Sequence, residues 1–218
     1  EKHDYHRGAG SFKKTTKAIR LLEEAGAIIR LAMTVTKNNI DDIQLMAECY
    51  GSKLIFQPLF NAGSARDSDM AITGEEYFYA LKNAKGVEPY SQLGQTLLRL
   101  RNRGTTKCAI GDVEISFSHN GDVYPCHMLH LPEYYAGNIR EQSISEIYRN
   151  SPILVKIRGI SIHSRENCRE CPVRLLCGGS CRARAFYLPG NLDAADNFCE
   201  YELLAFTEGL LSSVELTS

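Results

Sequence analysis

Apolar residues at helical spacing dominate the first part of the chain. Phe12, Ile19 and Leu22 recur at intervals that place them on one face of a helix. Ser11 precedes this pattern as the expected N-cap, and Gly26 follows it as the expected end. The pattern predicts an amphipathic helix between these two residues.

Two short strands are expected on either side of a second helix. The apolar run at 28–35 is typical of a buried strand, and a second run follows at 53–57. Between the runs, Asn39 is expected to cap a helix that stops at Gly51. Helix, strand, helix, strand is the order of a parallel α/β layer.

The rest of the chain predicts shorter elements. Thr73, three residues before Glu76, is a capped helix start, residues 93–103 have the pattern of a basic amphipathic helix, and Ser143 is expected to cap a helix through Tyr148. An apolar helix near the end of the chain is indicated by four leucines, Leu203, Leu204, Leu210 and Leu211.

A β-hairpin is predicted around Asn120 and Gly121. Strand patterns at 115–119 and 122–124 flank this dipeptide, which suits a two-residue type I′ turn because both positions take positive φ. Such a hairpin would bring Cys108 and Cys126 towards one another.

Composition and charge narrow the class of protein. The 218 residues are 44% hydrophobic, with 25 basic and 26 acidic side chains, so nothing indicates a nucleic-acid-binding stripe or a membrane surface. No apolar run approaches the length of a transmembrane helix. The expected location is therefore the cytoplasm.

Seven of the eight cysteines have a regular spacing. The segment 168–181 alone holds four, in the pattern CxxCx5CxxxC, and the seven are Cys108, Cys126, Cys168, Cys171, Cys177, Cys181 and Cys199. Soft thiolate ligands at short spacing favour iron–sulfur ligation. Structural zinc and disulfides are the competing interpretations, although an odd number of cysteines without a signal peptide argues against disulfides. Cys49, the eighth cysteine, is expected to be a buried structural thiol.

The cysteine pattern resembles the SPASM domain of radical S-adenosylmethionine (radical SAM) enzymes. The resemblance rests on Cys108, Gly121 and Cys126, on the later CxxCx5CxxxC run, and on Cys199. The surrounding sequence resembles the same domain at 120–126, 137–139, 143–148, 171–174 and 178–183.

Upstream, residues 3–8, 10–12 and 34–40 resemble the second half of a radical SAM partial (β/α) barrel. The CxxxCxxC loop of that family is absent from this chain. We therefore expect the C-terminal part of a larger enzyme: half-barrel 1–85, a linker or bridging helix 86–107, and a small α+β SPASM domain 108–218.

The resemblance also implies ligands. Cys108, Cys126 and Cys181 would bind one auxiliary 4Fe-4S cluster, nearer the active site. A second cluster would take the remaining four thiolates, from Cys168, Cys171, Cys177 and Cys199. The first cluster would thus have one iron without a cysteine, which is open, held by another ligand, or used to bind substrate.

The implied activity is modification of a peptide or protein, with maturation of a ribosomally made peptide as the first hypothesis. In the full-length enzyme a third 4Fe-4S cluster would cleave S-adenosylmethionine, with Arg7, Thr36 and Gln57 as candidate cofactor-binding residues and flavodoxin or ferredoxin as electron donor. This chain alone would then be inactive. Two different hypotheses are an anaerobic sulfatase-maturase-type enzyme and a non-catalytic iron–sulfur binding module.

Overall fold

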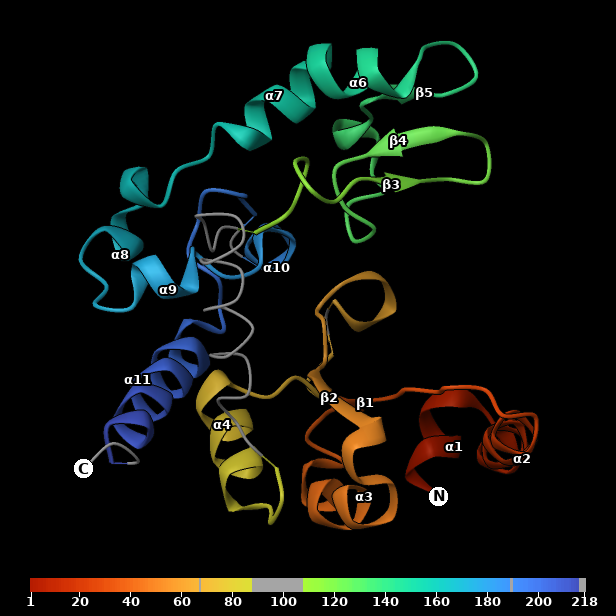
Figure 1. The fold of residues 1–218 in the computed structure, drawn as a ribbon. Coiled ribbons are helices and arrows are strands. Elements are labelled where there is room, and N and C mark those ends of the chain that lie inside the picture. The colour runs from red at the N-terminus through yellow and green to blue at the C-terminus, as the bar shows by residue number, and fades with distance from the viewer. Residues whose placement is uncertain (67, 88–107, 189, 216–218) are drawn as a thin grey trace. The chain divides into compact units, whose positions relative to one another are not determined.

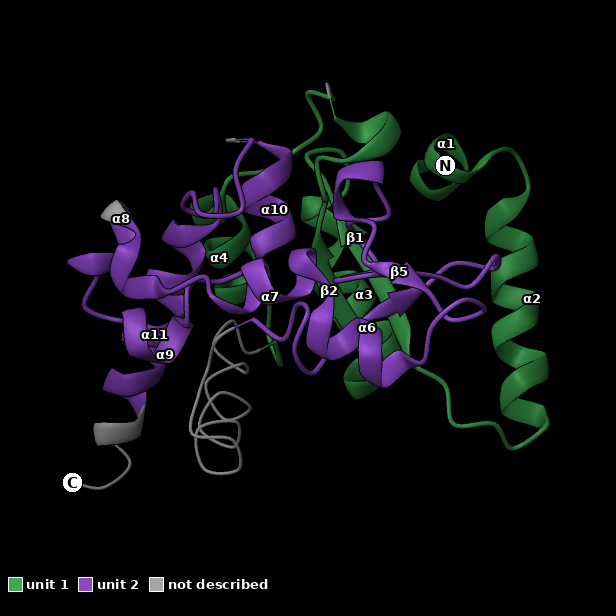
Figure 2. Ribbon diagram, turned by 90° about the horizontal axis from the view of Figure 1, so that it is seen from above, with its two compact units in different colours: residues 1–89 green, residues 90–218 purple. Residues whose placement is uncertain are grey.

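The computed structural model describes residues 1–66, 68–87, 108–188 and 190–215 (Figure 1). The chain divides into two compact units, Glu1–Pro89 and Tyr90–Ser218 (Figure 2). The division falls inside the predicted linker 86–107. The basic helix expected at 93–103 lies outside the described residues, so the bridging helix stays a prediction.

Two parallel strands form the centre of the first unit. β1 (Leu31–Val35) pairs with β2 (Leu54–Pro58), in register from Leu31 opposite Leu54 to Val35 opposite Pro58. The crossover between them contains η1 (Ile40–Asp42), α3 (Ile43–Tyr50) and η2 (Gly51–Lys53) (Figure 1). The predicted parallel α/β layer is confirmed, with strands that begin at 31 and 54 rather than at 28 and 53.

The amphipathic helix is capped differently from the prediction. α1 (Lys2–Arg7) is followed by α2 (Ser11–Glu24), whose N-cap is Gly10 and not Ser11. Capping comes from α1, because the Asp4 carboxylate accepts hydrogen bonds from the backbone N–H of Phe12 (2.7 Å) and Gly10 (2.9 Å) and from the Ser11 hydroxyl (2.9 Å). These donors, first Phe12 and then Gly10, lower the pKa of Asp4.

Asn39 also acts differently from the prediction. Its side chain makes no cap bond to the following helix; it accepts from the Thr36 N–H at 2.8 Å and donates to the Thr34 carbonyl at 2.9 Å. Asn39 therefore closes the turn after β1. The predicted helix ends are confirmed, since Gly26 and Gly51 follow α2 and α3 with positive φ.

The first unit ends with η3 (Gly63–Ala65) and α4 (Gly74–Asn83). The predicted capping box is present: Thr73 Oγ1 accepts from the Glu76 N–H, and the Glu76 carboxylate accepts from the Thr73 N–H. The inner face of α4 buries Tyr77, Phe78 and Leu81. By contrast α2 has no buried residue, so its predicted apolar face stays open among the described residues.

In the second unit a small antiparallel sheet comes first. β3 (Ser116–Phe117), β4 (Asp122–Tyr124) and β5 (Gly137–Asn138) pair in chain order. The predicted hairpin is present, but its turn is not type I′. The Gly121 N–H donates to the Ser118 carbonyl, and Gly121 alone of the predicted pair has positive φ. This is the three-residue loop with a glycine bulge.

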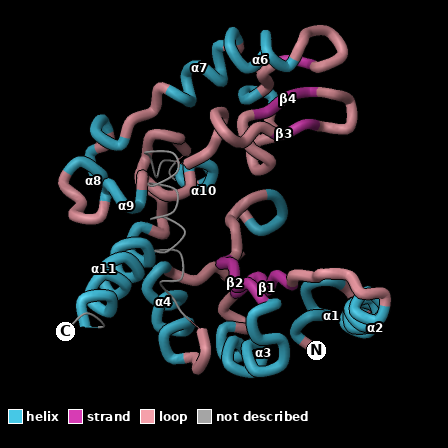
Figure 3. The backbone as a smooth tube through the Cα atoms, viewed as in Figure 1, coloured by secondary structure: helices cyan, strands magenta, loops and turns pink. Residues whose placement is uncertain are grey.

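Apart from the sheet, the described part of the second unit consists of helices and loops (Figure 3). The helices are η4 (Pro132–Tyr134), α6 (Ile144–Asn150), α7 (Pro152–Arg158), η5 (Ile162–Ser164), α8 (Glu166–Arg169), α9 (Arg174–Cys177), α10 (Arg182–Tyr187) and α11 (Cys199–Glu215), which is the longest of them. The Ser143 cap of α6 is confirmed, as a capping box with Glu146.

The last helix is present, but its buried face is not the leucine face. Tyr201, Ala205, Phe206 and Gly209 are buried, whereas Leu203, Leu210 and Leu211 are exposed. At 3.6 residues per turn the four buried positions fall within one arc of about 140°, and the three leucines lie outside it. The count of leucines was therefore a poor guide to the packed side.

Two clusters of buried side chains support the second unit. Val123, Ile147 and Leu154 pack between the sheet and the α6–α7 pair. Val173 and Phe206 form the other cluster, against which Cys171 and Cys177 are packed. Cysteine side chains thus extend the second cluster.

Candidate metal centres

The seven patterned cysteines lie at the ends of elements in the second unit. Cys126 follows β4, Cys177 ends α9, Cys181 is the N-cap of α10 and Cys199 begins α11. Cys168 lies in α8, while Cys108 and Cys171 lie in loops. All eight cysteines are free thiols in this structure.

The segment between Cys177 and Cys181 has an unusual backbone. Gly178, Gly179 and Ser180 have φ values of 66°, 89° and 53°, and Ser180 is the one described non-glycine residue with positive φ. A Cβ at Gly179 would overlap Nη1 of Arg165. Glycine adopts positive φ without strain at both positions, and at Gly179 the missing Cβ also leaves room for the Arg165 guanidinium.

One group of thiols surrounds Cys126. The pKa of the Cys126 thiol is raised to about 12, mainly by burial, with contributions from nearby Glu114, Cys108 and Cys181. The pKa of Cys181 is also raised, mainly by burial, and Cys108 again contributes. Cys108, Cys126 and Cys181 are thus within electrostatic range of one another.

A second group of thiols lies around Cys199. Burial raises the pKa of Cys177 to about 12, with a contribution from Cys199, and that of Cys199 to about 11, with contributions from Cys168 and Cys171. Hence the described residues bring Cys168, Cys171, Cys177 and Cys199 together. These groups correspond to the two ligand sets that the resemblance implies, and the binding of clusters by them stays a prediction.

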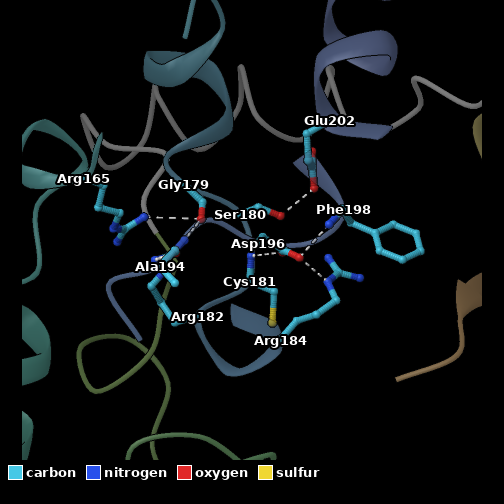
Figure 4. A network of polar contacts seen from close by, with 10 residues as sticks. All are labelled: Arg165, Gly179, Ser180, Cys181, Arg182, Arg184, Ala194, Asp196, Phe198 and Glu202. Atoms are coloured by element: carbon cyan, nitrogen blue, oxygen red, sulfur yellow. Dashed lines mark hydrogen bonds and ion pairs between the residues drawn. The ribbon is translucent and has the colours of Figure 1, made fainter. Parts of the chain in front are cut away.

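A network of buried charges links the segments that carry these thiols (Figure 4). Asp196, 2% exposed, accepts hydrogen bonds from the Cys181 N–H (2.9 Å), the Phe198 N–H (2.9 Å) and Arg184 Nε (2.7 Å). The Arg184 guanidinium also lies 4.4 Å from the centre of the Phe198 ring. One carboxylate therefore holds the starts of both α10 and α11.

Two buried arginines converge on the glycine segment. Arg165 and Arg182 both donate to the Gly179 carbonyl (Figure 4). Arg182 also donates to the carbonyls of Leu192 (2.6 Å) and Ala194 (3.1 Å). The two arginines are 5% and 2% exposed, and the Nε atom of each has no hydrogen-bond partner. Burial lowers the pKa of Arg182, yet a guanidinium stays protonated in proteins.

These observations fit iron–sulfur clusters. Thiols with raised pKa values are protonated when free, and metal binding replaces the proton and leaves a thiolate. A four-iron cluster with thiolate ligands is anionic, so buried guanidinium groups beside it offset its charge. The sequence analysis did not identify Arg165, Arg182 or Asp196 as site residues. The adjacency of Arg182 to Cys181 was the one available signal.

A smaller group of metal-binding side chains was also missed. Glu114, Cys126 and His127 place a ligand atom each within 4.8 Å of one another. Glu114 is twelve residues before Cys126, and the contact between its carboxylate and the Cys126 sulfur is one that the sequence pattern does not reveal.

The three candidate cofactor-binding residues lie in the first unit. Thr36 follows β1 and is 4% exposed, with a buried hydroxyl that has no hydrogen-bond partner. Gln57 is exposed in β2, opposite Thr34, at the same end of the strand pair. Arg7, the last residue of α1, is exposed, and its guanidinium takes part in none of the hydrogen bonds or ion pairs found among the described residues. Their cofactor role stays a prediction.

Cys49 is exposed, so the expectation of a buried thiol is wrong. α3 buries Ile43, and six further residues at 100° each carry the helix round to its solvent side at Cys49.

The second unit matches a known family. The SPASM model, an iron–sulfur cluster-binding domain, matches residues 108–172. The match covers less than half of the chain, and it makes this part similar to iron–sulfur cluster-binding domains. Among the described residues, no helix is long and apolar enough to cross a membrane.

Relatives extend the similarity over most of the chain. An AdoMet-dependent heme synthase of Oleidesulfovibrio alaskensis is 27% identical, over 93% of this chain and 58% of that protein. A PqqA peptide cyclase of Granulibacter bethesdensis is also 27% identical, over 88% of this chain and 54% of that protein. The chain thus spans less than three fifths of the length of either relative.

A solved structure has the same fold. Native anSMEcpe with bound AdoMet superposes with a TM-score of 0.73 at 17% identity, over 96% of this chain and 62% of that chain. Together with the SPASM match, these findings relate the chain to the radical SAM/SPASM enzymes, as the sequence indicates.

Proposed function

We propose that this chain is the cluster-bearing part of a radical SAM enzyme that modifies a peptide or protein. The match of residues 108–172 to an iron–sulfur cluster-binding domain carries the proposal, and the mutual electrostatic influence of the thiols within each of the two groups supports it. The similarity to a PqqA peptide cyclase supports a peptide as substrate.

The two sets define the proposed ligands. Cys108, Cys126 and Cys181 hold the first auxiliary 4Fe-4S cluster, and Cys168, Cys171, Cys177 and Cys199 hold the second. When bound, such clusters supply one-electron redox chemistry and cross-link the loops that ligate them. The residues of this chain bind the clusters, exclude water from them and offset their charge.

The first unit has the proposed role of a cofactor and substrate face. Thr36 and Gln57, at the carboxyl ends of parallel strands, lie where α/β folds bind ligands, and Arg7 is the proposed partner of the AdoMet carboxylate. A third cluster, and flavodoxin or ferredoxin as electron donor, belong to the full-length enzyme. The cytoplasm, where oxygen-labile clusters are protected, is the proposed location.

A second substrate class is favoured by one observation. The AdoMet-dependent heme synthase matches this chain at the same identity as the peptide cyclase, so a tetrapyrrole is the second candidate substrate. The anaerobic sulfatase-maturase-type enzyme and the non-catalytic iron–sulfur binding module rank below these two candidates.

Metal analysis of the anaerobically prepared chain tests the proposal. About eight iron and eight sulfide per chain are expected if both sites hold four-iron clusters. One or two zinc ions without iron would refute the cluster assignment. The chain alone should form no 5′-deoxyadenosine from AdoMet, because it lacks the CxxxCxxC loop.

Two cysteine variants test the grouping. Cys177→Ala should remove the electron paramagnetic resonance (EPR) signal of the four-thiolate cluster, and Cys181→Ala that of the three-thiolate cluster. The matched control is Cys49→Ala, an exposed cysteine outside both sets. Loss of the same signal in both variants would refute the grouping.

A further inference from the structure

We propose that Glu114 is the fourth protein ligand of the cluster held by Cys108, Cys126 and Cys181, and that His127 positions its carboxylate. This inference rests on the proposed function, since it assumes that the three thiols bind a cluster. It concerns the one iron to which no cysteine is assigned.

The position of Glu114 is fixed by the backbone around Cys126. The Glu114 N–H donates to the Ala109 carbonyl, and the Glu114 carbonyl accepts from the Gly111 N–H, each at 2.9 Å. The Gly111 N–H also donates to the carbonyl of Pro125, at 2.9 Å. The loop that follows Cys108 therefore doubles back and presents residue 114 to Cys126.

The side chains meet at that point. Oε1 of Glu114 lies 3.6 Å from Sγ of Cys126 and 2.9 Å from Nδ1 of His127. Because a carboxylate has no proton to give, Nδ1 of His127 donates this hydrogen bond. Carboxylates that bind metals are themselves held by hydrogen bonds from neighbouring groups, and His127 supplies such a bond here.

The two negative charges expected at this point, on the Cys126 thiolate and the Glu114 carboxylate, favour a bound cation. Cys126 must become a thiolate to bind iron, and the Glu114 carboxylate beside it would then repel it. A cation bound between the two groups turns this repulsion into attraction. The side chain of Glu114 is 44% exposed, so it has room to turn from the Cys126 sulfur towards a neighbouring iron of the same cluster.

The chemistry of the donor also fits an exchangeable position. A carboxylate is a harder ligand than a thiolate and binds iron of a sulfur-rich cluster less firmly. Glu114 would therefore protect the iron from water while leaving the position available to a stronger incoming ligand.

Glutamine, aspartate and cysteine substitutions in the anaerobically reconstituted chain test the assignment. Glu114→Gln should release about one iron per chain to a ferrous chelator at least about tenfold faster than the unchanged protein. It should also alter the EPR signal of the three-thiolate cluster and leave the other signal unchanged. Glu114→Cys should slow the release, and Glu114→Asp should fall between glutamine and the unchanged side chain.

The controls separate the outcomes. Glu133→Gln, an exposed glutamate of the same unit, should behave as the unchanged chain. The four-thiolate signal in the same sample reports that each variant is folded. If Glu114→Gln releases iron at the rate of the unchanged chain, the assignment is overturned. The assignment is also overturned if His127→Gln releases iron fast and Glu114→Gln does not, because the imidazole would then be the ligand. If the unchanged chain binds no iron, the proposed function itself is refuted.

Discussion

Asp196→Ala should destabilise the second unit more than any exposed acidic substitution. The variant removes the acceptor of three hydrogen bonds and leaves the Arg184 guanidinium buried, its side chain 13% exposed, without its carboxylate. Hydrogen bonds to a charged acceptor contribute about 1.5–3 kcal/mol each, so three would sum to about 4.5–9 kcal/mol.

Relaxation and entry of water reduce that sum. Breaking a buried ion pair by removing one partner costs about 3–5 kcal/mol, which is the expected loss in free energy of unfolding. In a chain of this size it corresponds to a fall of roughly 6–20 °C in the unfolding midpoint. Asp196→Asn, which keeps an acceptor oxygen but not the charge, should lose less.

Circular dichroism on the anaerobic, cluster-loaded chain measures this effect, at one scan rate for all variants because cluster loss makes unfolding irreversible. Asp193→Ala is the matched control, since Asp193 lies in the same loop and is exposed. Equal midpoints for Asp196→Ala and Asp193→Ala would show that the buried carboxylate does not support the unit.

Three further predictions concern local structure. Gly179→Ala should lower the free energy of unfolding by at least about 1–3 kcal/mol, because φ is +89° and the new Cβ overlaps Arg165. Gly190→Ala is the control for the backbone contribution alone, since φ is +81° and the space around it is open. Equal unfolding midpoints for the two variants would exclude the clash. Thr73→Ala should lower the free energy of unfolding, measured with denaturant, by about 1 kcal/mol because it removes the cap of α4. Thr73→Ser, which keeps the hydroxyl, should lower it little. An alanine variant as stable as the unchanged chain would contradict the capping role. Asp4→Asn should speed amide hydrogen exchange at Gly10 and Phe12 at neutral pH. The folded-state pKa of Asp4 is lowered from 3.8, so the contribution of its carboxylate to stability is present above pH 3.8 and is lost as the pH falls through the folded-state pKa. A difference in amide exchange between the unchanged chain and Asp4→Asn that persists below this pKa would be contrary evidence.

Local signals in the sequence were reliable for some features, although the caps expected at Ser11 and Asn39 and the type I′ turn at Asn120 were wrong. The capping boxes at Thr73 and Ser143 and the helix ends at Gly26 and Gly51 depend on residues within one turn, and each is present. The cysteine pattern indicated the SPASM domain through its resemblance to that family, and the family model matches residues 108–172.

Contacts between distant residues could not be predicted in this way. Asp4 caps α2 from another helix, and Glu114 reaches Cys126 across twelve residues. Arg165 and Arg182 meet at Gly179 through packing that no periodic pattern encodes. The leucines near the end of the chain show the same limit, because composition does not tell which arc of a helix meets its neighbours.

The ion pair between Arg184 and Asp196 joins α10 to the segment that precedes α11, with Arg184 Nε 2.7 Å from Asp196 Oδ1. Between these two residues in the chain, Leu188 and Asn191 are exposed, whereas Leu192 is buried. Lengthening a loop with fixed ends costs only about 0.6 kcal/mol for each doubling. The exposed positions Leu188 and Asn191 are therefore sites where insertions can accumulate during evolution, and where a fluorescent or affinity label can be attached.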